Sequence, residues 1–232
     1  MSTIRNLQFL LWGVLMATNV ISAPADNFDV LVYAQHWPKT SCYAFKQRNG
    51  NDCTFTKYNR WSIHGLWPSS IRGSYPEYCK NGPEFNMNSV RPLIHELRMK
   101  WKTINSKISP ESFWDYQWKK HGVCATSATK LETPQKYFKK ALELNSQYDI
   151  EIILKKAKII PGKSYSYQDI TNTLRRHLKY HSQIICYETP GASYLREIRI
   201  CFNKFLKVVD CPPVKTCASP MNIIYPDTLP KY

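Results

Sequence analysis

Acidic residues are scarce in this sequence, which also contains no internal repeat and no low-complexity linker. Asp and Glu number 17 against 32 Lys and Arg, so the formal net charge of the 232-residue chain is +15. A positive field of this strength favours an anionic partner such as nucleic acid, a heparin-like glycan or an acidic lipid surface. The 43% hydrophobic content excludes a disordered chain, and only 8 glycines exclude a collagen. The length predicts one globular domain, or at most two small ones.

Long hydrophobic runs are also absent beyond the N-terminal region. One apolar run spans residues 7–17, behind the positive charge of Arg5 and ahead of the small residue Ala23. It is shorter than the roughly 20 apolar residues that a membrane-spanning helix needs. This layout predicts a secretory signal peptide over residues 1–23 and a mature domain over residues 24–232, secreted or delivered to endosomes and lysosomes. An uncleaved signal anchor is the weaker alternative, and we expect no stable insertion in a membrane.

Cysteine pairs with the spacing of a zinc site are missing. There is no Cys-x2-Cys, and the closest two cysteines are too far apart for a zinc knuckle, so we expect no metal site. An even number of cysteines in a secreted chain instead predicts four disulfides. Spacing alone leaves 105 pairings open. The cysteines are Cys42, Cys53, Cys79, Cys124, Cys186, Cys201, Cys211 and Cys217.

Hydrophobic periodicity places strands towards both ends of the domain and helices in the middle. Strands are expected over residues 29–37 and 61–67, and the polar residues 40–60 between them predict a stapled loop or hairpin. Capping serines or threonines followed by proline or an acid predict helix starts in the middle. We expect helices over residues 89–102, 110–121, from 134 and from 166, and strands over 182–187, 194–202 and 205–209. This order predicts a single α+β domain with an antiparallel β-sheet core flanked by helices.

Two segments carry the residue types that RNA cleavage needs, namely residues 61–68 and 113–124. The reaction requires a base for the ribose 2′-OH, an acid for the leaving 5′-oxygen and cations for the phosphate. Imidazole suits both proton transfers because its ordinary pKa is about 6.5, and each segment contains one histidine. In the second segment Gln117, Lys120 and His121 fall at i, i+3 and i+4. They therefore share one helix face and can converge on one phosphate.

Other aromatic and histidine side chains have structural explanations. Trp67, Phe113 and Trp114 could offer stacking surfaces for bases. Trp114 and Trp118 are more typical of a protein core, however. Packed or solvated roles are expected for the remaining histidines, which are His36, His95, His177 and His181.

The same two segments resemble the two active-site motifs of the ribonuclease T-two family, which includes fungal Rh-type enzymes and plant self-incompatibility S-ribonucleases. The first motif is His-Gly-Leu-Trp-Pro at residues 64–68. The second motif consists of Phe113-Trp114, Trp118, Lys120-His121-Gly122 and Cys124. Gln35-His36-Trp37-Pro38 resembles the first strand of the family. The order of the cysteines is similar to that of animal members, and the second motif is similar to that of secreted helminth-egg ribonucleases.

The resemblance implies a role for three groups in the reaction. His64 would be the general acid that protonates the departing 5′-oxygen, and His121 would be the base at the 2′-OH. Lys120 would stabilise the charged transition state. The implied enzyme is an endoribonuclease of low base specificity that cuts single-stranded RNA to 2′,3′-cyclic phosphate ends without a metal or other cofactor. We expect it to act as a monomer.

The resemblance also implies a base-binding site and a disulfide pattern. Trp67 would stack on a base, while Phe113 and Gln35 would line the neighbouring base site. Animal members of the family imply the pairs Cys42–Cys53, Cys79–Cys124, Cys186–Cys217 and Cys201–Cys211.

Tyr116 and Gln117 depart from the family pattern, which has His-Glu at these two positions. Gln117 keeps a hydrogen-bonding carbonyl and amide but lacks the charge of glutamate, so a protonated His121 should be less favoured. Tyr116 can still donate a hydrogen bond to a phosphate. We predict reduced catalysis that survives the change, because removing one electrostatic group typically costs a few kcal/mol.

Two other functions stay open on the sequence alone. A catalytically weakened protein on the same scaffold would bind RNA, a cell-surface glycan or a receptor through its charge. A cysteine-rich inhibitor or toxin without catalysis would make the two histidine motifs coincidental.

Overall fold

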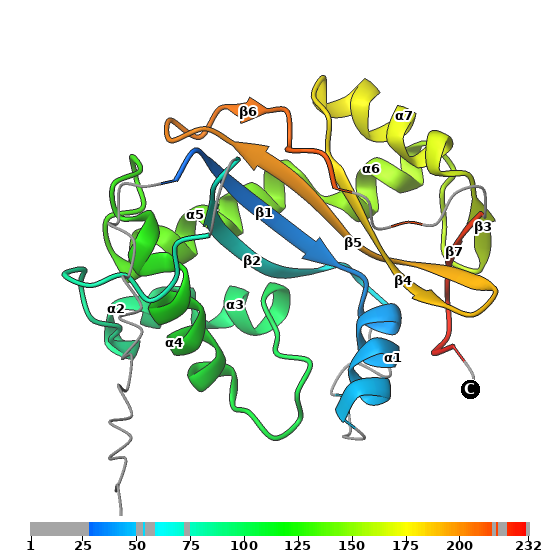
Figure 1. Ribbon diagram of the computed structural model, residues 1–232. Coiled ribbons are helices and arrows are strands. Elements are labelled where there is room, and N and C mark those ends of the chain that lie inside the picture. Colours follow the sequence, from blue (N-terminus) through cyan, green and yellow to red (C-terminus); the bar gives the residue numbers. More distant parts are fainter. Residues whose placement is uncertain are drawn as a thin grey trace, which may run out of the picture.

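One seven-stranded sheet organises the chain in the computed structural model, which describes residues 28–49, 53, 59–71, 75–214, 217 and 222–230 (Figure 1). The strands are β1 Val30–His36, β2 Ser62–Ser69, β3 Lys163–Tyr165, β4 Gln183–Thr189, β5 Ala192–Phe202, β6 Val208–Val209 and β7 Ile223–Tyr225. The path through the sheet is β2-β1-β5-β7-β3, and β4 and β6 also pair with β5. The β5–β7 pair is parallel and the other pairs are antiparallel. The α+β class is confirmed, with a mixed sheet. The expected signal peptide lies outside the described residues.

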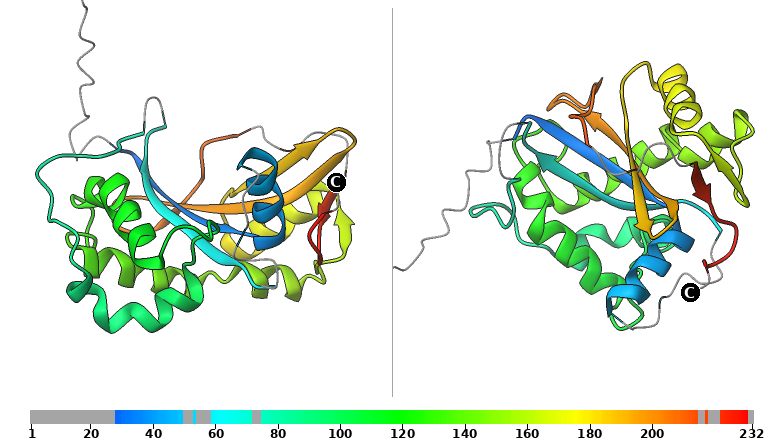
Figure 2. Two further views of the ribbon diagram at one scale, coloured as in Figure 1. Left: turned by 90° about the horizontal axis from the view of Figure 1, so that it is seen from below. Right: turned by 45° about the vertical axis from the view of Figure 1, so that its right-hand side comes forward.

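The helices cover the sheet and bury an aromatic core. They are α1 Pro38–Asn49, α2 Met87–Val90, α3 Ile94–Lys100, α4 Pro110–Lys120, α5 Pro134–Gln147, α6 Ile150–Lys156 and α7 Tyr167–Leu178, with 3-10 turns η1 Arg91–Leu93 and η2 Gly122–Ala125. Helices α2 to α5 gather on one side of the sheet (Figure 2). Trp101, Trp114, Trp118 and Tyr137 are buried in this core, which confirms the structural role expected for Trp114 and Trp118. Among the described helices, none is both long enough and apolar enough to cross a membrane.

Three helix starts are capped as the sequence predicts. Ser109, Thr133 and Ser166 lie directly before α4, α5 and α7, and each side-chain oxygen accepts a hydrogen bond from the backbone N–H three residues further on. These bonds satisfy N–H groups that have no partner within a helix. The cap of α4 matters for function because this helix carries Lys120 and ends next to His121.

The loop or hairpin expected over residues 40–60 is wrong, since the described part of this stretch begins with α1. The hydroxyl of Thr40 donates a hydrogen bond to the Leu195 carbonyl on β5 at 2.7 Å. Cys42 and Ala44 are also buried against the domain. The helix is therefore stabilised by docking onto the sheet, which local polarity does not reveal.

Other differences from the expected elements have local causes. The helix expected over residues 89–102 is divided into α2, η1 and α3, because Pro92 cannot donate a helical hydrogen bond and interrupts the ladder. The last strand expected over residues 205–209 is shortened to β6. Helix α6 and the short strands β3 and β7 were not predicted, and β3 and β7 pair with each other across a long sequence separation.

Four disulfides join the described elements in the pairs that the resemblance implies. Cys79–Cys124 connects the segment after β2 to η2, directly behind the end of α4. Cys201–Cys211 connects β5 to the segment that follows β6. The other two are Cys42–Cys53 and Cys186–Cys217. The first two hold segments that border the cleft described next.

Candidate active site

A β-bulge in β2 directs His64 out of the protein core. The β1–β2 register pairs Ala34 with Gly65 and then Gln35 with Ile63, so it skips His64. A bulge of this kind changes the alternation of side chains along a strand. Ile63 and Leu66 both pack in the main core as a result, while His64 and Trp67 are partly exposed. The bulge therefore places two residues of the first motif on one face, although they lie three positions apart.

The second motif is positioned by the C-terminal end of α4. The backbone N–H of His121 donates to the carbonyl of Gln117 at 3.1 Å, so His121 closes the last turn of the helix. The carbonyl of Lys120 accepts from the backbone N–H of Tyr78 at 3.0 Å. The neighbouring disulfide at Cys124 holds the same turn from behind. These contacts fix the backbone at the end of α4 and therefore the positions from which the Lys120 and His121 side chains project.

The two imidazoles line one cleft of about 400 Å³ between β2 and α4. Both imidazoles lie near the indole of Trp67, whose ring centroid is 4.9 Å from that of His64 and 5.6 Å from that of His121. Its Nε1 donates to Oε1 of Gln117 at 3.3 Å, which links the two elements across the cleft. A Cβ atom on Gly65 would lie 2.0 Å from this Nε1, so glycine is required for the indole to fold back over the strand. Tyr116 and Lys120 also line the cleft.

His121 is neutral at physiological pH in this environment. Burial lowers the pKa of His121 to about 3, and the positive charges of Lys120 and His64 act in the same direction. Gln117 supplies no negative charge that would oppose these effects. The ring is therefore available as a proton acceptor.

Lys120 keeps its positive charge inside the cleft. A hydrogen bond with Tyr116 raises the pKa of Lys120, and Glu77 contributes in the same direction. The Lys120 Nζ lies 3.4 Å from a Glu77 carboxylate oxygen and 5.6 Å from the centre of the Tyr116 ring. A cation held between these groups can meet the negative charge of a phosphate.

Gln35 and Phe113, which the resemblance places at the neighbouring base site, lie outside this cleft. Gln35 is buried in the domain, where its Nε2 donates to the Tyr148 carbonyl at 2.7 Å and its Oε1 accepts from Asn145 at 3.2 Å. Phe113 is partly buried and packs against the main core. Both therefore support the helices around the cleft, and neither is among the described residues that line it.

Glu197 and Arg199 belong to the cleft region and were missed in the sequence. Glu197 is 2% exposed and contacts the His64 Nδ1 through one carboxylate oxygen. Arg199 lines the cleft, contacts the other oxygen of Glu197, and lies with its Cζ 5.5 Å from the centre of the Trp67 ring. The available signal was a group of three charged residues, Arg196, Glu197 and Arg199, inside a predicted strand.

The described residues contain no group of three or more His, Cys, Asp or Glu side chains arranged to hold a metal ion. The groups that line the cleft include two imidazoles, an ammonium, a guanidinium, two phenols and the carboxylate of Glu77. The cations and N–H donors of this set are of the kind that bind anions.

Comparison with known proteins agrees with this arrangement. Residues 28–211 match the model of the Ribonuclease T2 family. Ribonuclease Oy of Magallana gigas is 34% identical over 191 residues, which cover 80% of this chain and 88% of that protein. Extracellular ribonuclease LE of Solanum lycopersicum is 32% identical and covers 89% and 90% of the two chains. The solved structure of ribonuclease MC1 from bitter gourd seeds is 28% identical, with a TM-score of 0.74, over 85% of this chain and all of the other. With both histidine motifs in one cleft and these similarities over most of its length, the chain belongs to the Ribonuclease T2 family.

Proposed function

We propose that this endoribonuclease cleaves single-stranded RNA by transesterification in the cleft between β2 and α4. The observation that carries this proposal is that the His64 and His121 rings both line one cleft and both lie near the Trp67 indole, with Lys120 lining the same cleft. Two proton-transfer groups and a cation around one cavity are what an in-line reaction at a phosphodiester requires.

In the first half of the reaction His121 acts as the general base. Its neutral ring accepts the proton of the ribose 2′-OH as that oxygen attacks the phosphorus. Lys120 stabilises the negative charge that increases on the non-bridging phosphate oxygens. Tyr116, which lies beside Lys120 and is 44% exposed, donates a hydrogen bond to the same phosphate.

In the second half His64 acts as the general acid. The bond between phosphorus and the 5′-oxygen breaks, and His64 gives its proton to that oxygen. The products are a 2′,3′-cyclic phosphate on one fragment and a free 5′-OH on the other. Atoms and protons balance, because the proton taken up by His121 equals the one released by His64.

Trp67 is the base-stacking residue of the site in this proposal. Its ring is partly exposed in the cleft and every base has a π-face, so the contact favours no particular base. Gln35 and Phe113 act indirectly, through the packing of α4 and α5. The amide of Gln35 is bonded to Tyr148 and Asn145, which supports the low base specificity proposed here.

The assay that tests this function uses the purified protein, a single-stranded RNA oligonucleotide and excess EDTA. We expect cleavage to continue in EDTA and to leave 2′,3′-cyclic phosphate ends, detected by mass spectrometry. A DNA oligonucleotide of the same sequence is the control, since it lacks the 2′-OH nucleophile and should stay intact. Cleavage of the DNA, or products ending in a 3′-OH, would refute transesterification.

We also propose that the protein is secreted as a monomer after removal of residues 1–23. The short apolar run and the four disulfides support this location, because disulfides persist in oxidising compartments. N-terminal sequencing of the protein from culture medium, beginning at Pro24, is the expected result.

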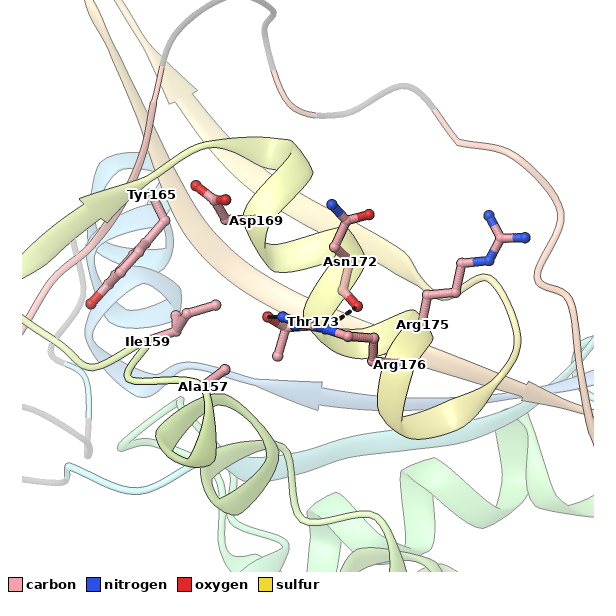
Figure 3. Close-up of a pocket in the computed structure, with 8 residues that line it drawn as sticks. All are labelled: Ala157, Ile159, Tyr165, Asp169, Asn172, Thr173, Arg175 and Arg176. Carbon is pink, nitrogen blue, oxygen red and sulfur yellow. Dashed lines mark hydrogen bonds between the residues drawn. The ribbon is translucent and has the colours of Figure 1, made fainter.

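A second anionic partner is favoured by a basic surface away from the catalytic cleft. Residues 155–179 contain seven Lys and Arg against one Asp. Within this stretch the segment that follows α6, strand β3 and helix α7 border an open groove of about 570 Å³ (Figure 3). Arg175 and Arg176 lie at one end of the groove, and Tyr165 and Asp169 lie at the other. The groove shares none of its described lining residues with the catalytic cleft.

We propose that this surface binds a sulfated cell-surface glycan, whose repeated charges complement spaced cations. The triple variant Arg175→Ser/Arg176→Ser/Lys179→Ser should elute from heparin at a NaCl concentration about 0.2 M lower than wild type. The control removes three exposed lysines near and on α5: Lys130→Ser/Lys136→Ser/Lys139→Ser. Equal elution of the two variants would contradict the proposal. A lower kcat/KM on long RNA alone would assign the surface to RNA.

A further inference from the structure

We propose that Glu197 is the positioning residue of the general acid His64, and that it also fixes Arg199 in the cleft. The inference rests on the proposed function of His64. Glu197 lies on β5, is 2% exposed, and uses both carboxylate oxygens. Oε2 contacts the Nδ1 of His64, and Oε1 contacts the Nε of Arg199. One buried carboxylate therefore connects a proton-transfer group with a cation of the cleft.

The register of the strands places Glu197 next to His64. In the β1–β5 register Glu197 stands opposite His36, and the bulge in β2 places His64 over the same position. The His36 and His64 rings stack with centroids 5.0 Å apart and planes inclined by 15°. His36 in turn contacts the Ser41 hydroxyl through its Nδ1 at 3.0 Å. Hence the carboxylate, both histidines and the bulge form one rigid layer.

Glu197 is ionised despite its burial. Burial alone would raise the pKa of Glu197, but the charges and hydrogen bonds of His64 and Arg199 outweigh it and hold the pKa well below its ordinary value. Burial lowers the pKa of His36 well below its usual range, so the stacked ring stays neutral and adds no competing charge. The negative charge of Glu197 is thus directed at His64 and Arg199.

The consequence for His64 is a fixed orientation and a fixed tautomer. A carboxylate that accepts the Nδ1–H leaves Nε2 as the atom presented to the cleft. The ring is held on one face by His36 and on its edge by Trp67, whose plane is inclined by 82°. Nε2 is therefore the atom from which a proton reaches the leaving 5′-oxygen.

The contact with Glu197 also holds the Arg199 guanidinium in the cleft, where it provides a second cation, besides Lys120, for the phosphate. Its Nε is occupied by Glu197, and one terminal nitrogen lies 3.5 Å from the Gln183 amide oxygen. The guanidinium lies over Trp67 and lines the cleft. A planar guanidinium fixed in this way can meet phosphate oxygens. The chain thus lacks the carboxylate that its family has at position 117, but carries a buried carboxylate behind the other histidine.

The test compares two substrates that differ in their need for a general acid. A diribonucleotide has a 5′-alkoxide leaving group that must be protonated, whereas a nucleoside 3′-(4-nitrophenyl phosphate) with the same base releases a stable phenolate. Glu197→Gln should lower kcat on the diribonucleotide about thirtyfold and change KM less than about threefold. On the nitrophenyl substrate the same variant should lose less than about threefold in kcat.

Two further variants separate positioning from folding. Glu197→Asp keeps the charge and should recover part of the lost kcat on the diribonucleotide. In a His64→Ala background, Glu197→Gln should lower kcat on that substrate by less than about threefold, because the proton-transfer group is gone and only the contact with Arg199 remains to be lost. The control is Glu188→Gln on the adjacent strand β4, which should match wild type.

The possible results of these experiments separate the role of Glu197 from the proposed function of the protein. An equal loss on both substrates would refute the positioning of His64, since a defect of packing or of Arg199 affects both substrates alike. An unchanged kcat on the diribonucleotide would refute any role of Glu197 in the reaction. If Glu197→Gln fails to fold, Glu197→Asp carries the same two-substrate comparison. If the wild-type protein cleaves neither substrate, the proposed function itself fails, and this result is distinct from a failure of the Glu197 proposal.

Discussion

Replacing His121 by alanine is expected to lower kcat/KM on a diribonucleotide about a thousandfold. A general base contributes between about a hundredfold and ten-thousandfold to a proton-transfer reaction. His121 is the neutral imidazole of the cleft, and its removal leaves the 2′-OH without a proton acceptor. The fold should survive, because His121 follows the last residue of α4 and is only partly buried. Initial rates at pH 6 for wild type and variant give the comparison.

The matched control is His95→Ala, since His95 is an exposed histidine on α3 outside the cleft. This variant should cleave at the wild-type rate. His64→Ala should lose activity on the diribonucleotide to a similar extent as His121→Ala. Retention of more than about a tenth of the wild-type rate by His121→Ala would assign the base to another group.

Replacing Gln117 by glutamate is expected to raise kcat about thirtyfold. Gln117 is buried and accepts a hydrogen bond from the Trp67 indole, a contact that a carboxylate oxygen also makes. A negative charge one helical turn from His121 would raise the pKa of that ring from about 3 towards the pH of the assay. A base whose pKa lies closer to the working pH accepts a proton more effectively.

The pH profile provides an independent measurement of the same change. A base works only when it is deprotonated, so activity falls as the pH drops through its pKa. In wild type the pKa of His121 is about 3, so His121 should cause no fall of kcat/KM between pH 7 and pH 5. In Gln117→Glu this acidic fall should move to higher pH. Gln168→Glu, an exposed change on α7, is the control with the same charge difference. An unchanged or lower rate in Gln117→Glu would contradict this account of position 117.

Local signals were sufficient for several parts of the fold. Ser109, Thr133 and Ser166 cap their helices as expected, because a cap depends on a hydrogen bond to a residue three positions away. The strands around His64 and in residues 194–202 were also predictable from their apolar content. Helix α1 was not, since its stability depends on docking to β5 through Thr40 and its buried neighbours.

Some residues of the candidate site could likewise be predicted from the sequence, and others could not. His64, Trp67, Lys120 and His121 could be named from two short segments, since their residue types and spacing already indicate RNA cleavage. Glu197 could not, because its role depends on a register between β1 and β5 and on a bulge in β2. Charged residues inside a strand were the one sign of it.

By itself the sequence determined the chemistry of this protein: two imidazoles, a neighbouring lysine, a basic net charge and enough cysteines for four disulfides. These properties belong to residues and their near neighbours, so they can be identified without coordinates. The tertiary structure decided which carboxylate contacts His64, where Gln35 and Phe113 lie, and that His121 is neutral. All three depend on burial and on contacts between distant strands and helices. The effect of burial on a pKa, as for His121, is set only when the surrounding atoms are packed in place.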